Sequence, residues 1–163
     1  MKFTVKSDNK RFQIFLKRFI KESEKEAGAG LNDIAFTLMK RVVARWPVDK
    51  RIGRGGRSRA AWLVSLEKLS GNKNIMPSVR GGGTNPKEVA QGRKLGFLKR
   101  KIKNTKNPYI EIINMVHYAL KLEYGYSSQA PYGVVRREMR KLSGNVMPEK
   151  LGNRLVRKWN RGW

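Results

Sequence analysis

Apolar residues recur at helical spacing over the first third of the chain, after a short alternating stretch at residues 1–6 that predicts a strand. One apolar stripe covers residues 12–20 and a second covers residues 31–46. The glycine-containing sequence at residues 27–30 lies between them and predicts a break near Ala27, because each glycine destabilises a helix interior by about 1 kcal/mol. Pro47 ends the second stripe, since the residue before a proline avoids helical backbone angles. We therefore expect a long N-terminal helical region with an interruption.

Shorter elements are expected downstream. Residues 60–69 alternate around Trp62 and predict a strand with one more buried face. Residues 87–103 carry a thin apolar stripe on a basic background, which predicts an amphipathic helix. Residues 107–115 are β-branched and alternating, which predicts a strand. Helices are expected over residues 116–124, ended by Gly125, over residues 134–142 and near the C-terminus.

These elements predict one α+β domain over residues 1–163. Its long N-terminal helical region and its helices flank a small, mainly antiparallel β-sheet. Residues 70–106 are expected to form a basic excursion, because much of that stretch is rich in Gly, Asn, Pro and basic side chains. Residues 147–163 are expected to form a basic C-terminal tail.

The charge of the chain changes this picture most. There are 37 basic and 12 acidic residues, a formal charge of +25, and residues 51–110 alone carry 15 basic and 2 acidic groups. Such a field attracts polyanions, with nucleic acid the first candidate and an acidic membrane surface the second. The plainer alternative is a highly soluble surface. The residues expected to contact DNA or an acidic partner are Arg51, Arg54, Arg57, Arg59, Arg80, Lys94, Lys99, Arg100, Lys101 and Lys103. Such contacts to phosphates carry no sequence information.

Candidate catalytic chemistry is sparse. The chain has one histidine, His117, and no cysteine, which excludes disulfides and thiolate metal sites. The glycine-rich stretches at residues 53–56 and 80–87 do not match a phosphate-binding loop, and no nucleophile elbow is present. The acidic residues are too dispersed to suggest a nuclease. No apolar run reaches the roughly 18 residues of a membrane span, and residues 1–12 lack a signal-peptide core. We therefore expect a protein made in the cytoplasm, with no enzymatic activity, no cofactor and no bound metal.

Three separated stretches resemble one known family: WPVD at residues 46–49, RAAWLVS at residues 59–65 and IINMVHYALKLEYGYSSQAPYG at residues 112–133. Together they resemble tailed-bacteriophage neck and tail-completion proteins, which show P-V-D-T-G, then R-x-x-W, then a strand ending in Asn and Y-A-x-x-L-E-x-G-x-S-x-Q-A-P. The resemblance spans about residues 30–142, but KRIGRGG replaces the plain T-G and residues 70–106 are unconstrained. The matching positions are Pro47, Val48, Asp49, Gly53, Arg59, Trp62, Asn114, Tyr118, Ala119, Leu122, Glu123, Gly125, Ser127, Gln129, Ala130, Pro131 and Gly133.

The resemblance implies a non-catalytic virion protein in the neck or upper tail, a head–tail joining or tail-terminator protein. It implies an oligomeric ring, expected to be a hexamer, whose partners are other neck and tail proteins. Genomic DNA would pass through the lumen without sequence-specific contact, and no membrane is involved. Closed rings repeat one contact, so basic segments on each copy would form a positive collar around the DNA. We further expect Glu123 to accept hydrogen bonds from backbone amides of the next loop, or from an arginine of a neighbouring subunit, and so to fix residues 127–131.

Three alternative functions remain open at this point. A non-specific nucleic-acid-binding protein of the ribosome- or nucleoid-associated type would need no ring. A metal-dependent nuclease would need a cluster of acidic residues. A cationic membrane-active protein would act through its Arg- and Trp-containing tail. None of the three requires the motif at residues 112–133, which favours the phage family.

Overall fold

The computed structural model describes residues 9–48, 55–73, 75, 85–103, 107–128, 130–143 and 146–160. Within these ranges it is an α+β protein with a two-stranded antiparallel sheet and helices around it, as the sequence predicted. The predicted strand at residues 1–6 lies outside the described ranges, as do residues 74, 76–84 and 104–106 of the predicted basic excursion. The rest of that excursion contains α3 and β1. The elements are α1 (Asn9–Arg45), α2 (Arg57–Ser70), α3 (Pro86–Lys94), β1 (Gly96–Lys101), β2 (Tyr109–Asn114), α4 (Ala119–Glu123), α5 (Val135–Ser143) and α6 (Val146–Asn160).

Helix α1 runs without a break for 37 residues, so the predicted interruption near Ala27 is wrong. Gly28 is buried on α1 where the chain leaving β1 comes close. A Cβ atom at Gly28 would lie 2.2 Å from the carbonyl oxygen of Ile102. The glycine therefore serves the packing of the sheet on α1, and this tertiary contact outweighs its weak helix propensity.

Residues 57–70 form helix α2, so the strand predicted over residues 60–69 is also wrong. Leu63, Leu66 and Leu69 are buried at a spacing of three residues, which places them on one helical face. Their neighbours are mostly good helix formers, and the helix ends at Gly71, whose left-handed backbone (φ 73°) lets its N–H bond to the carbonyl of Glu67. The alternation around Trp62 therefore suggested the two-residue period of a strand, whereas the buried leucines follow the period of a helix.

The basic segment at residues 87–103 is divided between a helix and a strand, so the single predicted helix is half right. Helix α3 begins after Asn85, whose side chain accepts a hydrogen bond from the Lys87 N–H, with Pro86 in the first turn. Strand β1 then pairs with β2, and Leu98 lies opposite Ile112 in the register. These two side chains pack on the core, whereas Lys99 and Lys101 of β1 are exposed. The predicted strand at residues 107–115 is confirmed as β2.

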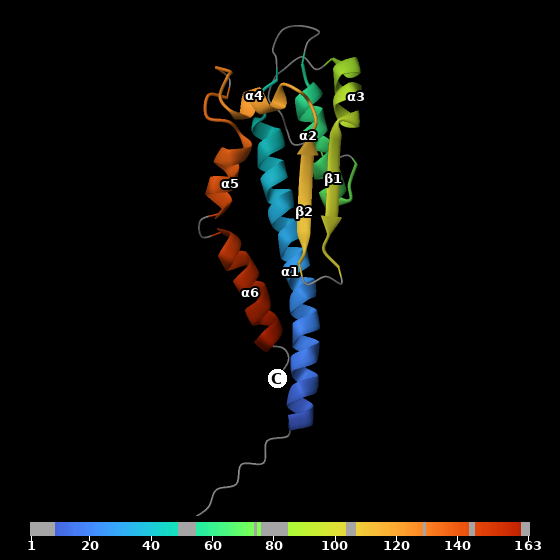
Figure 1. Cartoon of the computed structure of the whole chain (residues 1–163), viewed down its shortest axis with the longest axis vertical. Helices are drawn as coiled ribbons and strands as arrows, with labels where there is room; N and C mark the ends of the chain where they lie inside the picture. The colour runs from blue at the N-terminus through green and yellow to red at the C-terminus, as the bar shows by residue number, and fades with distance from the viewer. Residues whose placement is uncertain are drawn as a thin grey trace, which may run out of the picture.

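Helix α1 is the long axis of the molecule, and its N-terminal half extends beyond the sheet (Figure 1). Helix α2 contacts α1, α3 and the sheet, and the main core lies where α1 and α2 meet. Helices α5 and α6 lie along the other side of α1 (Figure 1). The predicted helices near residues 116–124, 134–142 and the C-terminus are confirmed as α4, α5 and α6.

Two groups of ion pairs, around Arg154 and around Glu138, fix this second side. Arg154 of α6 pairs with Glu26 at 3.3 Å and with Asp33, both on α1. Glu138 of α5 is 1% exposed and pairs with Arg45 at the end of α1 and with Lys141 at 3.1 Å. Burial raises the pKa of Glu138, but hydrogen bonds from Lys141 and Arg45 outweigh that effect and leave the pKa below its ordinary value of 4.5. Glu138 is therefore a charged anchor for α5.

Candidate interaction surfaces

The family-like residues that lie in the described ranges meet where β2, α2 and α4 come together. Asn114 ends β2, and its amide nitrogen donates to the carbonyl oxygen and the hydroxyl of Ser58, at 2.9 and 3.2 Å. Its amide oxygen accepts from the N–H of Val116 at 3.1 Å. The hydroxyl of Tyr118 accepts from the Ser58 N–H at 3.3 Å. Because the N-cap residue Gly56 has no side chain to cap α2, Tyr118 takes over part of that role.

The aromatic members of the motif support the same junction. Trp46 is buried at the end of α1, and its ring meets Trp62 edge-on with 5.3 Å between ring centroids. Pro47 comes after Trp46 at the end of α1, and Ala119 is buried at the start of α4. The residues therefore join α1, α2 and α4.

Glu123 caps helix α5. One carboxylate oxygen accepts from the N–H groups of Val134 and Val135, both at 2.9 Å, and the other accepts from the N–H of Arg136 at 2.7 Å. The Arg136 side chain also pairs with this carboxylate, at 3.3 Å. A carboxylate at a helix N-terminus is stabilised by the free N–H groups and the helix dipole. The expectation of backbone amide partners is confirmed, but the amides belong to the first turn of α5 and not to residues 127–131.

Two glycines make that cap sterically possible. Gly133 has a left-handed backbone (φ 71°), and a Cβ atom there would lie 2.2 Å from the Glu123 carbonyl oxygen. Gly125 is also left-handed (φ 84°), and a Cβ atom there would lie 2.2 Å from the carbonyl oxygen of Pro131. The motif therefore folds the loop between α4 and α5 back on the Glu123 cap. Asp49, Gly53 and Gln129 of the motif lie outside the described residues.

The predicted basic contacts separate into two groups. Arg57 is partly exposed, and its guanidinium is engaged within the chain by two hydrogen bonds with Glu88 of α3, at 2.7 and 2.8 Å. This pairing raises the pKa of Arg57. Arg59 is half-buried, and burial lowers the pKa of its guanidinium. Both therefore serve the fold rather than an open surface. Arg51, Arg54 and Arg80 lie outside the described residues.

The remaining predicted cations are exposed on a strip of chain along β1 and the ends of its flanking segments, where Arg100 points to the opposite face of the strand from Lys99 and Lys101. We call this strip the lysine-rich face, and it consists of Lys94, Lys99, Arg100, Lys101 and Lys103. Lys99 faces Glu111 across the strands at 3.6 Å, and Arg100 donates to the Asn32 amide oxygen at 3.1 Å. The ammonium groups of Lys94, Lys101 and Lys103 have no ion-pair partner within the described ranges. Lys101 and Lys103 also line an open hollow of about 580 Å³ against α1.

A second cationic surface was missed as a site by sequence reasoning. Helix α5 exposes Arg136, Arg137, Arg140 and Lys141 around an open hollow of about 640 Å³, which Pro131 and Tyr132 complete. We call this hollow and the exposed side chains of α4 and the following loop the α4–α5 surface. Its signal was present in the sequence: the four cations occupy the positions that Glu138 and Leu142, on the buried face, leave free. The basic face of this helix was visible, but its association with exposed tyrosines was not.

His117 is exposed, and its ring meets Tyr118 edge-on with 5.1 Å between centroids. Among the described residues, no group of three or more His, Cys, Asp or Glu side chains is placed to hold a metal ion. No helix in the same ranges is both long and apolar enough to cross a membrane.

Comparisons with models of protein families, with curated proteins and with solved structures found no match for this chain.

Proposed function

We propose that the protein is a structural component of the neck or upper tail of a tailed bacteriophage, where copies form a ring that completes the tail or joins it to the head. The observation that carries the proposal is the role of the family-like residues. Asn114, Tyr118 and Glu123 each hold the start of another helix through hydrogen bonds. Motif residues with this role fit a building part better than a catalyst.

The charge distribution supports DNA or an acidic neighbour as a partner. Seven acidic side chains in the described ranges form ion pairs within the chain: Glu26, Asp33, Glu67, Glu88, Glu111, Glu123 and Glu138. Their charges are compensated locally, so the field outside the molecule is dominated by unpaired cations. In a ring, the lysine-rich face would line the DNA passage through contacts to phosphates. The hexameric state and the position in the neck are part of the proposal.

The test is quantification of the protein in purified particles of a phage whose genome carries it. We expect a fixed, low copy number relative to the capsid protein, equal to one ring and close to six. Particles that contain none of the protein would overturn the proposal. A copy number that varies between preparations would equally contradict a ring.

A second candidate is a non-specific nucleic-acid-binding protein, favoured by the unpaired ammonium groups of Lys94, Lys101 and Lys103. This second function predicts a different result in the same experiment: the protein would be absent from particles and bound to nucleic acid in the lysate. Binding should then fall with salt along a straight log–log line.

A further inference from the structure

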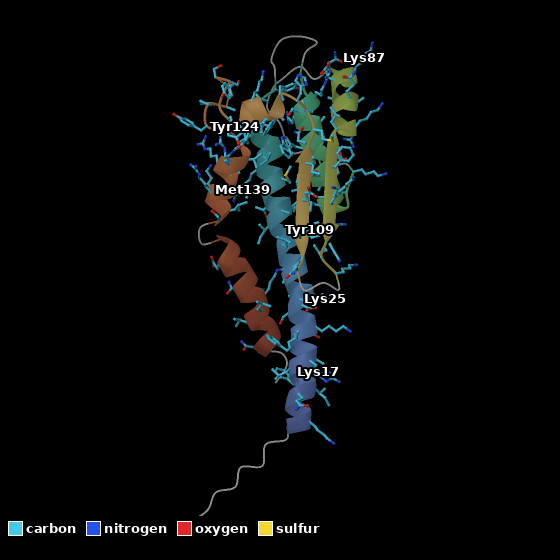
Figure 2. All side chains as sticks on the ribbon, in the orientation of Figure 1. Lys17, Lys25, Lys87, Tyr109, Tyr124 and Met139 are labelled. Atoms are coloured by element: carbon cyan, nitrogen blue, oxygen red, sulfur yellow. The ribbon has the colours of Figure 1, made fainter. Side chains whose placement is uncertain are left out.

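The α4–α5 surface combines exposed aromatic and apolar side chains with unpaired arginines. Tyr126 is 83% exposed, Tyr132 is 77% exposed and Leu120 is 66% exposed. Tyr124 lies under the guanidinium of Arg136, 4.6 Å from the ring centroid. Figure 2 places Tyr124 and Met139 on this side of the molecule, away from the sheet. Side chains of this size are costly to leave in water over one region, which indicates an interaction site.

The cations of this surface are available to a partner. Arg137 and Arg140 are exposed, and their guanidinium groups have no ion-pair or hydrogen-bond partner within the described part of the chain. Among the residues that the structure describes, no acidic side chain lines the hollow. The nearby carboxylates of Glu123 and Glu138 are already engaged, one with the α5 amides and the other with Arg45 and Lys141. The hollow therefore offers a pair of guanidinium forks, which match carboxylate or phosphate geometry.

The composition favours a protein over a nucleic acid as the occupant. Protein interfaces are enriched in Tyr, Met and Arg and depleted in Lys, and Tyr and Arg dominate their binding energy. The α4–α5 surface exposes Leu120, which gains from contact with apolar side chains and offers little to a polynucleotide. The lysine-rich face also lies beside exposed aromatic side chains, Phe97 and Tyr109, but its cations are four lysines and one arginine.

A second copy of this chain is a poor occupant. Every copy has a formal charge of +25, and seven of its 12 acidic side chains are already in ion pairs within the described ranges. Two copies that both used this surface would therefore bring like charges together at Arg137 and Arg140, which costs binding energy.

We propose that the α4–α5 surface is a docking site for a negatively charged segment of a different protein, whose carboxylates pair with Arg137 and Arg140 while its apolar side chains cover Tyr126 and Tyr132. The inference rests on this surface alone and does not require the virion role.

The test uses the full chain and two fluorescent probes of equal charge. One is a capped peptide that repeats Glu-Glu-Tyr-Leu, and the other is a single-stranded oligothymidylate. The first variant is Arg137→Ala with Arg140→Ala, and its matched control is Lys101→Ala with Lys103→Ala, which removes the same charge from the lysine-rich face. The second variant is Tyr126→Ser with Tyr132→Ser. All the substituted side chains are exposed, and thermal unfolding of each variant checks that the fold is kept.

We expect the arginine variant to weaken peptide binding about tenfold, since charge-assisted bidentate contacts are lost. The lysine control should weaken it less than twofold. The tyrosine variant should weaken peptide binding severalfold and leave oligothymidylate binding unchanged. Equal losses of peptide affinity in the arginine variant and the lysine control would show that the peptide responds only to the overall charge of the protein, and would overturn the proposal. A larger loss for the oligothymidylate in the tyrosine variant would make this a base-stacking nucleic-acid surface instead. Self-association that only the arginine variant abolishes would make the occupant a second copy.

Discussion

The lysine-rich face and the α4–α5 surface carry the same sign of charge but differ in how they are built. Lys101 lies opposite the exposed Tyr109 in the strand register and Lys94 and Lys103 flank β1, whereas the arginines of α5 surround a hollow beside Tyr132. They lie on opposite sides of α1 (Figure 1). Lysine is a flexible point charge, while arginine is a rigid fork that also stacks on aromatic rings. The same net charge can thus serve a featureless phosphate backbone on one side and a shaped partner on the other.

The two regions also differ in their internal support. The ion pair between Lys99 and Glu111 on the sheet is long and half-exposed, at 3.6 Å. Helix α5, in contrast, is fixed by the buried Glu138 and by the Glu123 cap. A surface that must keep a defined shape for a partner needs such anchors, and a surface that only supplies charge does not.

The largest effect should come from Glu138→Ala, which removes the anchor between α5 and α1. We expect the free energy of unfolding to fall by about 2–3 kcal/mol, because charge-assisted hydrogen bonds to a buried carboxylate are lost. The matched control is Glu111→Ala on the lysine-rich face, where an exposed pair contributes less than about 0.5 kcal/mol. Urea unfolding of both variants measures the difference. Similar losses of unfolding free energy in the two variants would show that α5 is no more firmly anchored than the lysine-rich face.

The next effect should come from Glu123→Gln. The amide keeps the shape of the side chain but loses its charge at the start of α5, so stability should fall by about 1–2 kcal/mol. Hydrogen exchange of the N–H groups of Val134, Val135 and Arg136 should quicken. Glu149→Gln is the control, since Glu149 is exposed on α6. Unchanged exchange at those three amides would show that Glu123 is not their cap.

A smaller effect should follow from pH. The pKa of Glu138 is lowered in the folded protein, so its contribution is fully present above its ordinary pKa of 4.5 and is lost as the pH falls through the folded value. Stability should therefore decline more steeply in this acidic range for the wild-type chain than for Glu138→Gln. Urea unfolding midpoints at a series of pH values give both slopes. Identical slopes would mean that Glu138 carries no charge in the folded state.

The smallest effect on the fold should come from Lys101→Ala with Lys103→Ala. Stability should stay within about 0.5 kcal/mol, because both side chains are exposed. Binding to duplex DNA should lose up to about 0.9 in log–log salt slope for each phosphate contact removed. Fluorescence anisotropy over a salt series measures it. An unchanged salt slope would show that these two lysines do not contact DNA phosphates.

Sequence reasoning succeeded where local signals and packing agreed. Pro47 marked the end of α1, the β-branched run at residues 109–114 marked β2, and Gly125 marked the end of α4. It failed where a tertiary contact determined the structure. Gly28 suggests a helix break, but it lies inside α1, where its missing side chain lets the backbone of Ile102 pack closely. In α2, an apolar run was compatible with both periods, and burial of the leucine face selected the helix. Backbone amides were expected as the partners of Glu123. Which amides these are could not be predicted, because the position of α5 beside Glu123 depends on tertiary packing and not on a local sequence pattern.

The central proposal, a structural part of the phage neck or upper tail, is tested most directly by immunogold electron microscopy of intact particles with an antibody against this protein. The account predicts label confined to the head–tail junction or the upper end of the tail. Absence of label from particles, with the protein instead found on nucleic acid in the lysate, would contradict it and leave a nucleic-acid-binding protein in its place.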